Sequence, residues 1–237
     1  MNRRFQRNVQ AQVSYTWSHC IDNSSSTYGL EGGLPILDPY DAAHDRGNCL
    51  FDRRHSLVIS SLVALPFKGA FAGHQLIEGW QLTGIWNVRT GPPLNILTGF
   101  DQSGLGLSTN HNRPSLKPGR TWDDIKIGKL NRWFDPTAFT LQPVGTIGNL
   151  GRNVFFGPGF SNIDFSAMKN TRLKEQLNLQ FRAEFYNLLN HPNWGLPNVN
   201  VFTQAANGGG NYSPAAGTIT SLAAPQRQIQ FALKMIF

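Results

Sequence analysis

The fold is decided by the stretch Arg227-Gln-Ile-Gln-Phe-Ala-Leu-Lys-Met-Ile-Phe237, in which apolar and polar side chains alternate. A β-strand points successive side chains to opposite faces. One face would carry Ile229, Phe231, Leu233, Met235 and Phe237, and the other Gln228, Gln230, Ala232 and Lys234. Eleven residues rise roughly 36 Å, which at about 45° of tilt spans about 25 Å, the height of the apolar band of an outer-membrane barrel. The stretch therefore predicts a membrane-spanning strand; the alternative is the last strand of a soluble two-sheet sandwich with a one-sided core.

The composition favours strands and turns over helices. The chain of 237 residues contains 24 Gly, 14 Pro and 16 Phe, and only 15% of its residues are charged, against about one quarter in an average soluble protein. No run approaches 18 consecutive apolar residues, so a helical membrane span is excluded. A membrane protein of this composition must form the wall of a β-barrel.

The net charge is +7, from 21 basic and 14 acidic side chains. Nucleic acid is one partner that such a charge suggests, but the basic residues are scattered and lack an aromatic platform for single strands. We therefore expect no nucleic-acid partner. A basic loop surface that faces the phosphates of outer-membrane lipid accounts for the same charge.

The two cysteines are Cys20 and Cys49, separated by a Gly/Ser/Pro/Asp-rich segment. Their spacing matches no zinc or redox motif. A disulfide that closes this loop is the favoured interpretation and implies an oxidising compartment such as the periplasm or cell surface; two free thiols are the alternative.

Six segments in all are predicted to be strands. Besides the last one, they are Val9–Ser18, His55–Leu65, Trp80–Ile96, Ile163–Met168 and Leu177–Tyr186. Pro92 and Pro93 predict a bulge or local break in the third of these. The apolar pattern of the second leaves its facing ambiguous.

The connections between these segments alternate in length. They are long at 19–54, 98–160 and 190–226, and short at 67–77 and 171–175. This alternation is typical of an up-and-down membrane barrel with short periplasmic turns and long external loops. Six strands are fewer than the eight that close the smallest outer-membrane barrels, and residues 1–8 lack the apolar stretch of a secretory signal. We therefore expect an all-β, antiparallel barrel segment that belongs to a longer chain.

Seven blocks of sequence resemble the end of one family, the Oar-like TonB-dependent outer-membrane receptors. The strongest are Gly148-Asn-Leu-Gly-Arg-Asn-Val-Phe-Phe-Gly-Pro-Gly159, Asn162-Ile-Asp-Phe-Ser166 and Leu177-Asn-Leu-Gln-Phe-Arg-Ala-Glu-Phe-Tyr-Asn-Leu-Leu-Asn-His-Pro-Asn193. The others, in the same order as in the family, are Asp52-Arg-Arg-His55, Leu65-Pro-Phe67, Gly79-Trp-Gln-Leu-Thr-Gly84 and Trp133-Phe-Asp-Pro-Thr-Ala-Phe139. The resemblance covers nearly the whole chain.

The resemblance implies a location in the cell outer membrane and a barrel of about 22 strands, plugged by an amino-terminal domain and energised through TonB to import a scarce nutrient. Residues 1–237 would be the carboxyl-terminal part of that barrel domain, without plug or TonB-contacting segment and not competent for transport alone. The implied partners are membrane lipid, plug domain, TonB, an unknown imported substrate and the barrel-assembly machinery. That machinery would recognise the closing-strand signal formed by Phe231, Leu233, Met235 and Phe237.

Two groups of polar residues are candidate binding sites. Inside a barrel, the lumen or a plug would be faced by Gln180, Arg182, Glu184, Gln228, Gln230 and Lys234. Plug binding is the favoured role for them and substrate contact the alternative. The loop from Trp122 to Phe139 could offer an aromatic surface to a ligand, or fold over its own aromatic side chains.

Potential metal ligands are densest in Asp41, His44, Asp45, Asp52 and His55, but their spacing fits no metal motif. Solvated loop residues are the favoured interpretation, with Asp52 and His55 joined to Arg53 and Arg54 in a charged cluster where the loop enters the wall. No metal, cofactor or catalytic constellation is expected. The alternatives to the receptor are a secreted soluble all-β ligand-binding module and, resting on this cluster alone, a secreted β-rich hydrolase.

Overall fold

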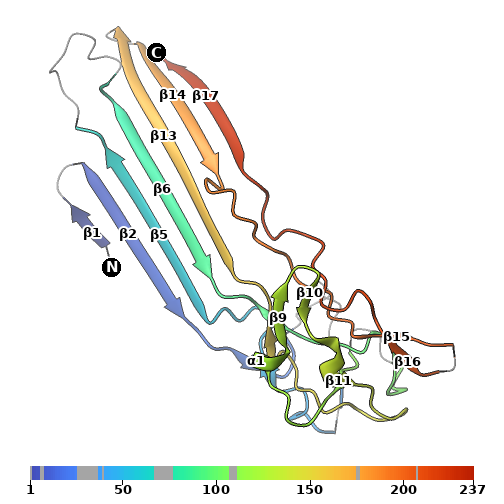
Figure 1. Ribbon diagram of the computed structural model, residues 1–237. Coiled ribbons are helices and arrows are strands. Elements are labelled where there is room, and N and C mark those ends of the chain that lie inside the picture. The colour runs from blue at the N-terminus through green and yellow to red at the C-terminus, as the bar shows by residue number, and fades with distance from the viewer. Residues whose placement is uncertain are drawn as a thin grey trace.

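The computed structural model describes residues 2–5, 8–25, 37–38, 40–66, 77–106, 111–174, 177–206 and 208–237, with the side chains of 2–5 and 174 excepted. The molecule has two parts, a large sheet of long strands and a compact body at one end of it (Figure 1). We call this body the cap. It is made of the described residues of 18–54, 90–159 and 187–227.

The sheet is antiparallel throughout and follows the order of the chain. Among the described residues its strands are β1 (Asn2–Phe5), β2 (Val9–Trp17), β5 (His55–Ala64), β6 (Trp80–Arg89), β13 (Phe160–Lys174), β14 (Leu177–Tyr186) and β17 (Gln228–Ile236). Each strand pairs with its neighbour in sequence, which is the connectivity of an up-and-down barrel wall. The sheet is open, because β1 and β17 each pair on one side only within this part of the chain.

The six predicted strands are all present, with three differences. β1 was not predicted, because Asn-Arg-Arg-Phe has no apolar alternation, yet it pairs with β2 over four residues. β13 runs for 15 residues and includes part of the predicted short turn at 171–175. β6 ends at Arg89 rather than continuing to Ile96, so Pro92 and Pro93 mark a break.

The apolar face of the sheet has no second sheet packed on it within the described residues, which distinguishes the fold from the sandwich alternative. The fold class is an antiparallel β-barrel segment, as predicted. Among the described residues, no helix is long and apolar enough to cross a membrane.

The long connections gather at one end of the sheet, where they form the cap (Figure 1). Its elements are short: β3 (Ile21–Asp22), β4 (Gly47–Asn48), β7 (Pro93–Leu94), β8 (Ser115–Leu116), α1 (Trp122–Ile125), β9 (Lys126–Lys129), β10 (Arg132–Phe134), the 3₁₀ helix η2 (Pro136–Ala138), β11 (Phe139–Thr140), β12 (Phe155–Phe156), β15 (Phe202–Gln204) and β16 (Gly210–Tyr212). The described parts of the long connections therefore contain secondary structure of their own.

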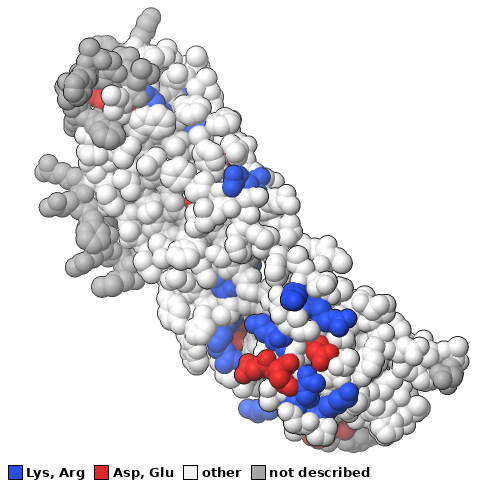
Figure 2. Space-filling model, in the orientation of Figure 1, with Lys and Arg blue, Asp and Glu red and all other residues white. Residues whose placement is uncertain are grey.

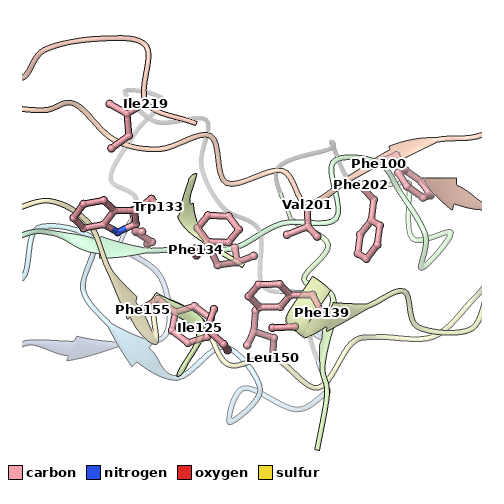
Figure 3. Packing of buried hydrophobic residues seen from close by; sticks show 13 residues of the cluster. Phe100, Ile125, Trp133, Phe134, Phe139, Leu150, Phe155, Val201, Phe202 and Ile219 are labelled. Atoms are coloured by element: carbon pink, nitrogen blue, oxygen red, sulfur yellow. The ribbon is translucent and has the colours of Figure 1, made fainter. Parts of the chain in front are cut away.

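The main hydrophobic core lies in the cap and not on the sheet (Figure 3). Phe134 and Phe139 are fully buried and meet edge to face with ring centroids 5.9 Å apart, and Phe139 meets Phe155 in the same way at 5.9 Å. Trp122 stacks on Phe155 at 4.5 Å. Aromatic pairs of this kind add about 0.5–1.5 kcal/mol each beyond the area they bury. The segment Trp122 to Phe139 thus folds over its own aromatic side chains, the second of its two predicted arrangements.

The cap is joined to the sheet through two segments that approach closely. β7, which follows β6 in the chain, pairs with β12, which precedes β13. Gly91 lies against the backbone of Gly157 so tightly that a Cβ at position 91 would overlap the Gly157 carbonyl. This contact fixes the base of the cap to the two central strands.

Candidate functional site: the two sheet faces and the cap

The strand register places polar side chains together on one face of the sheet. Directly opposite residues of paired strands share a face, so the face can be followed from β2 to β17. Its polar residues include Gln10, Gln12, Ser14, Thr16, Ser56, Ser60, Gln81, Thr83, Asn87, Asn162, Asp164, Ser166, Asn170, Gln180, Arg182, Glu184, Gln228, Gln230 and Lys234. Most carry an amide or hydroxyl group, and the register adds the charged residues Arg89 and Arg172 to this face.

The six predicted lumen-facing residues lie together at the β14–β17 pair. Gln180 is opposite Lys234, Glu184 is opposite Gln230, and Gln228 is opposite Tyr186. The order along β14 brings Arg182 between Gln180 and Glu184 on the same face. The structure therefore assembles one polar patch from two strands that are separated by a long connection in sequence.

Hydrogen bonds link the β14 side chains of this patch into a ladder that also includes Asn170 of β13. The Arg182 guanidinium donates to Gln180 Oε1 at 3.2 Å and lies 3.5 Å from Glu184 Oε1. Glu184 also accepts from the Tyr186 hydroxyl at 3.1 Å, and Gln180 donates to Asn170 at 2.9 Å. The Arg182 side chain is still 43% exposed, so the patch keeps donors for a molecule on this side of the sheet.

The opposite face is apolar and exposed. On β17, Phe231 and Leu233 are each 66% exposed and Met235 is 59% exposed. Phe231 stacks with Phe181 of β14 at 6.3 Å. The strand β5, whose facing was ambiguous from sequence, places Leu57, Ile59, Ser61 and Val63 on this face. A broad apolar surface with no protein cover is what a lipid-facing wall requires.

Aromatic side chains mark both ends of the apolar face. At the cap end, the Tyr15 hydroxyl and His55 Nδ1 are 2.8 Å apart and Trp17 is 60% exposed. At the other end, the Lys169 ammonium lies 5.5 Å from the Trp80 ring centroid. Amphipathic rings at the two ends of a spanning sheet are typical of membrane interfaces.

A disulfide joins Cys20 and Cys49 in the cap. Cys49 is fully buried, and its backbone N–H donates to the Cys20 carbonyl at 3.0 Å. Both sulfurs and the Asp22 carboxylate lie within 4.8 Å of one another. Because the sulfurs are bonded to each other and Asp22 pairs with Arg152, this group offers no thiolate ligand to a metal ion.

The predicted solvated cluster is only partly solvated. Asp45 is 3% exposed and lies 2.8 Å from the guanidinium of Arg113, and Asp52 is 2% exposed and pairs with Arg54 at 3.4 Å. The expectation of a solvated loop residue is wrong for Asp45, because it is buried with Arg113 from another long loop. Asp52 lies in the expected charged cluster, where it pairs with Arg54. Asp41 and His55 are exposed, as expected.

Two arginines that the sequence reasoning did not single out connect the disulfide loop to the rest of the cap. Arg113 also donates to the carbonyls of Leu150 and His44, at 2.9 and 3.0 Å. Arg152 donates to the Asp45 carbonyl at 2.7 Å and to the Ser25 hydroxyl at 3.0 Å. Burial lowers the pKa of Arg113 and outweighs the opposing effect of Asp45, but an arginine remains charged. The cap is thus a preformed body held by buried ion pairs.

Comparison with known proteins gives one family. The family model described as outer membrane beta barrel domain matches residues 1–230. No match was found among curated proteins or among solved structures. The match extends over the sheet and the cap alike, and not over the strands alone.

Proposed function

The chain belongs to the family of outer membrane β-barrel domains, and from this we propose that it forms barrel wall and external loops of an Oar-like TonB-dependent receptor for nutrient uptake. The family places it in the cell outer membrane. The two unlike faces of the sheet agree with such a wall. The receptor identity rests on the sequence blocks that resemble that family.

The observation that carries the proposal is the polar patch of β14 and β17, with its hydrogen-bonded ladder along β14. In a wall whose apolar face meets lipid, the face of Gln180, Arg182 and Glu184 is turned to the barrel interior. The interior of such a barrel is polar, and a plug that fills it needs donors and acceptors along its contact surface. We propose that this ladder binds the plug domain of the receptor, with substrate contact as a secondary role.

The cap supports a role in substrate capture. A folded body on the long-connection end of a barrel is the part that a nutrient from outside meets first. We therefore place the cap outside the cell and the short turns in the periplasm. The disulfide between Cys20 and Cys49 would then lie in an oxidising environment.

The remaining partners follow from the open edges of the sheet. Backbone groups at β1 and β17 need strand partners within lipid, so we propose that further strands complete the barrel. The barrel-assembly machinery would recognise the closing-strand signal formed by Phe231, Leu233, Met235 and Phe237. TonB would energise the complete receptor, and we assign the chain no catalytic role, cofactor or nucleic-acid partner.

Photocrosslinking at two neighbouring positions tests this function. A photoreactive amino acid is placed at Arg182 or at Phe181, which lie on opposite faces of β14, and outer membranes are irradiated in the native host. We expect position 182 to crosslink to a plug domain identified by mass spectrometry, and position 181 to crosslink to lipid alone. Protein crosslinks from position 181 together with none from 182 would contradict the proposal.

A further inference from the structure

The hairpin of β9 and β10 exposes three cations on the cap. Lys126, Lys129 and Arg132 are all exposed, and Lys129 lies directly opposite Arg132 in the register. Like charges in directly opposite positions destabilise a strand pair. A surface hairpin with this pair gains stability from any anion that binds between the two side chains.

The protein itself provides little compensation for these charges. The neighbouring Arg120 is engaged by Asp124 at 2.5 Å and by Asp135 at 3.3 Å. Lys126 lies over the Trp133 ring, 5.5 Å from its centroid. Within the described ranges, neither Lys129 nor Arg132 takes part in an ion pair. Among the described residues, no carboxylate pairs with these two cations, so both side chains are available to an anion from outside.

Two aliphatic side chains of the same hairpin are exposed beside these cations. Ile127 is 40% exposed and Leu130 is 46% exposed. Cations interleaved with exposed aliphatic groups are typical of segments that lie in the headgroup region of a membrane. A soluble acidic partner needs only the cations for binding. The exposed Ile127 and Leu130 therefore favour a lipid as the partner.

The hairpin lies in the layer of the cap nearest the strands (Figure 1). The Trp133 indole N–H donates to the Phe156 carbonyl at 3.0 Å, and β13 begins only four residues later at Phe160. The Leu130 carbonyl accepts from the Ile219 N–H at 2.8 Å, which fixes the hairpin to the returning chain. Figure 2 shows Lys and Arg side chains, with Asp and Glu side chains among them, on the cap where Figure 1 draws this hairpin, while few charges lie on the face of the sheet turned to the viewer.

We propose that the β9–β10 hairpin binds the phosphate groups of lipid headgroups in the leaflet on the cap side of the membrane. Lys129 and Arg132 hold the phosphate, while Ile127 and Leu130 enter the adjacent acyl boundary. The contact anchors the cap at the membrane surface and relieves the repulsion between the two opposed cations. This site is distinct from the polar sheet face and does not depend on transport.

A ³¹P NMR titration of the purified protein in neutral detergent micelles tests the site, with dihexanoyl phosphatidylglycerol, dihexanoyl phosphatidylcholine and inorganic phosphate as separate probes. We expect phosphatidylglycerol to bind most tightly. Each cation near an anionic lipid surface contributes about fivefold in affinity. The double variant Lys129→Gln/Arg132→Gln should therefore bind phosphatidylglycerol roughly 25-fold more weakly.

Two further variants separate binding from folding. Arg46→Gln/Lys117→Gln removes the same charge from other parts of the cap and should retain the affinity of the wild type. Lys129→Glu places opposite charges across the hairpin, so the urea midpoint should hold or rise while phosphatidylglycerol binding is lost. Unchanged affinity in the Lys129/Arg132 double variant, equal loss in the control, or equal affinity for inorganic phosphate would overturn the proposal.

Discussion

Arg113 and Asp45 lie 68 residues apart in sequence, yet the Arg113 guanidinium is 2.8 Å from the Asp45 carboxylate and both side chains are buried. Asp45 also accepts from the backbone N–H of Leu37 at 2.5 Å. The pair joins the disulfide loop to the connection between β6 and β13. The cap therefore depends on a contact between two long loops and not only on its aromatic core.

Replacement of Arg113 by Met should destabilise the cap strongly. Met keeps much of the apolar stem but leaves the Asp45 carboxylate buried without its cation, which costs about 3–5 kcal/mol. Urea unfolding in detergent micelles measures the loss. Arg120→Met is the control, since its partners Asp124 and Asp135 both remain in contact with water and the effect should be much smaller. Equal losses in the two variants would mean that the buried pair has no special role.

Removal of the disulfide should destabilise the cap through the unfolded state. Cys20 and Cys49 are 29 positions apart, and closing a loop of this length contributes about 3–4 kcal/mol by the chain-entropy estimate. Unfolding of the wild type with and without a reductant measures the difference. The Cys20→Ser/Cys49→Ser variant should have the stability of the reduced wild type, and the reductant should not change its stability. A reductant effect in that variant would show that the measured loss has another origin.

Asp101 should make the cap sensitive to acid. Partial burial alone would raise the pKa of Asp101, but hydrogen bonds from Ser103, Gly106, Asn112 and Gly104 together lower it below the ordinary value. Because the folded-state pKa is below the unfolded value of about 3.9, the stabilisation is present above that pH and is lost as the pH falls through the folded-state pKa.

The Asp101→Asn variant tests this pH dependence. Its free energy of unfolding should fall less than that of the wild type between pH 5 and lower pH, as followed by urea titrations at each pH. Asp123→Asn removes one exposed carboxylate from the same cap and controls for net charge. If Asp101→Asn and the wild type lose the same stability in acid, the hydrogen-bonded carboxylate is not the cause.

A charge placed on the two faces of β17 should have unequal effects. Leu233→Arg puts a guanidinium on the apolar face, at a cost of about 2–4 kcal/mol if the site is near the bilayer midplane. Gln230→Arg adds the same side chain to the polar face, directly opposite Glu184, and should cost much less. Urea titration of the protein inserted in phospholipid vesicles compares them. A larger loss for Gln230→Arg would reverse the assignment of the faces.

The strands were predictable where one local pattern decides the structure. β14 was predicted to the residue, because Leu177–Tyr186 alternates without interruption, and β17 pairs with it from Asn178 to Tyr186 in one unbroken register. β1 could not be predicted, since Asn-Arg-Arg-Phe becomes a strand only by pairing with the amino-terminal half of β2. The length of β13 has the same origin, because Asn170 to Lys174 is polar except for Leu173 and is held in the sheet by β14.

The cap was not predictable from local patterns. The local sequence around Asp45 does not distinguish it from a solvated loop aspartate. Its burial depends on Arg113, which lies 68 residues away in sequence. The aromatic content of Trp122 to Phe139 was the one signal of a buried core, and it was equally compatible with an exposed ligand surface. The six polar residues of β14 and β17 were identifiable because strand alternation alone places them on one face.

The central claim, that the sheet spans the outer membrane with one face in lipid, is tested most directly by spin-label accessibility along β17. Single cysteines at positions 229 to 235 are labelled in the protein inserted in phospholipid vesicles; the described residues contain no free cysteine to interfere. Labels at 229, 231, 233 and 235 should be accessible to oxygen and shielded from a water-soluble nickel complex, while 230, 232 and 234 should show no such lipid exposure. Uniform access of the nickel complex, without a period of two, would contradict the account.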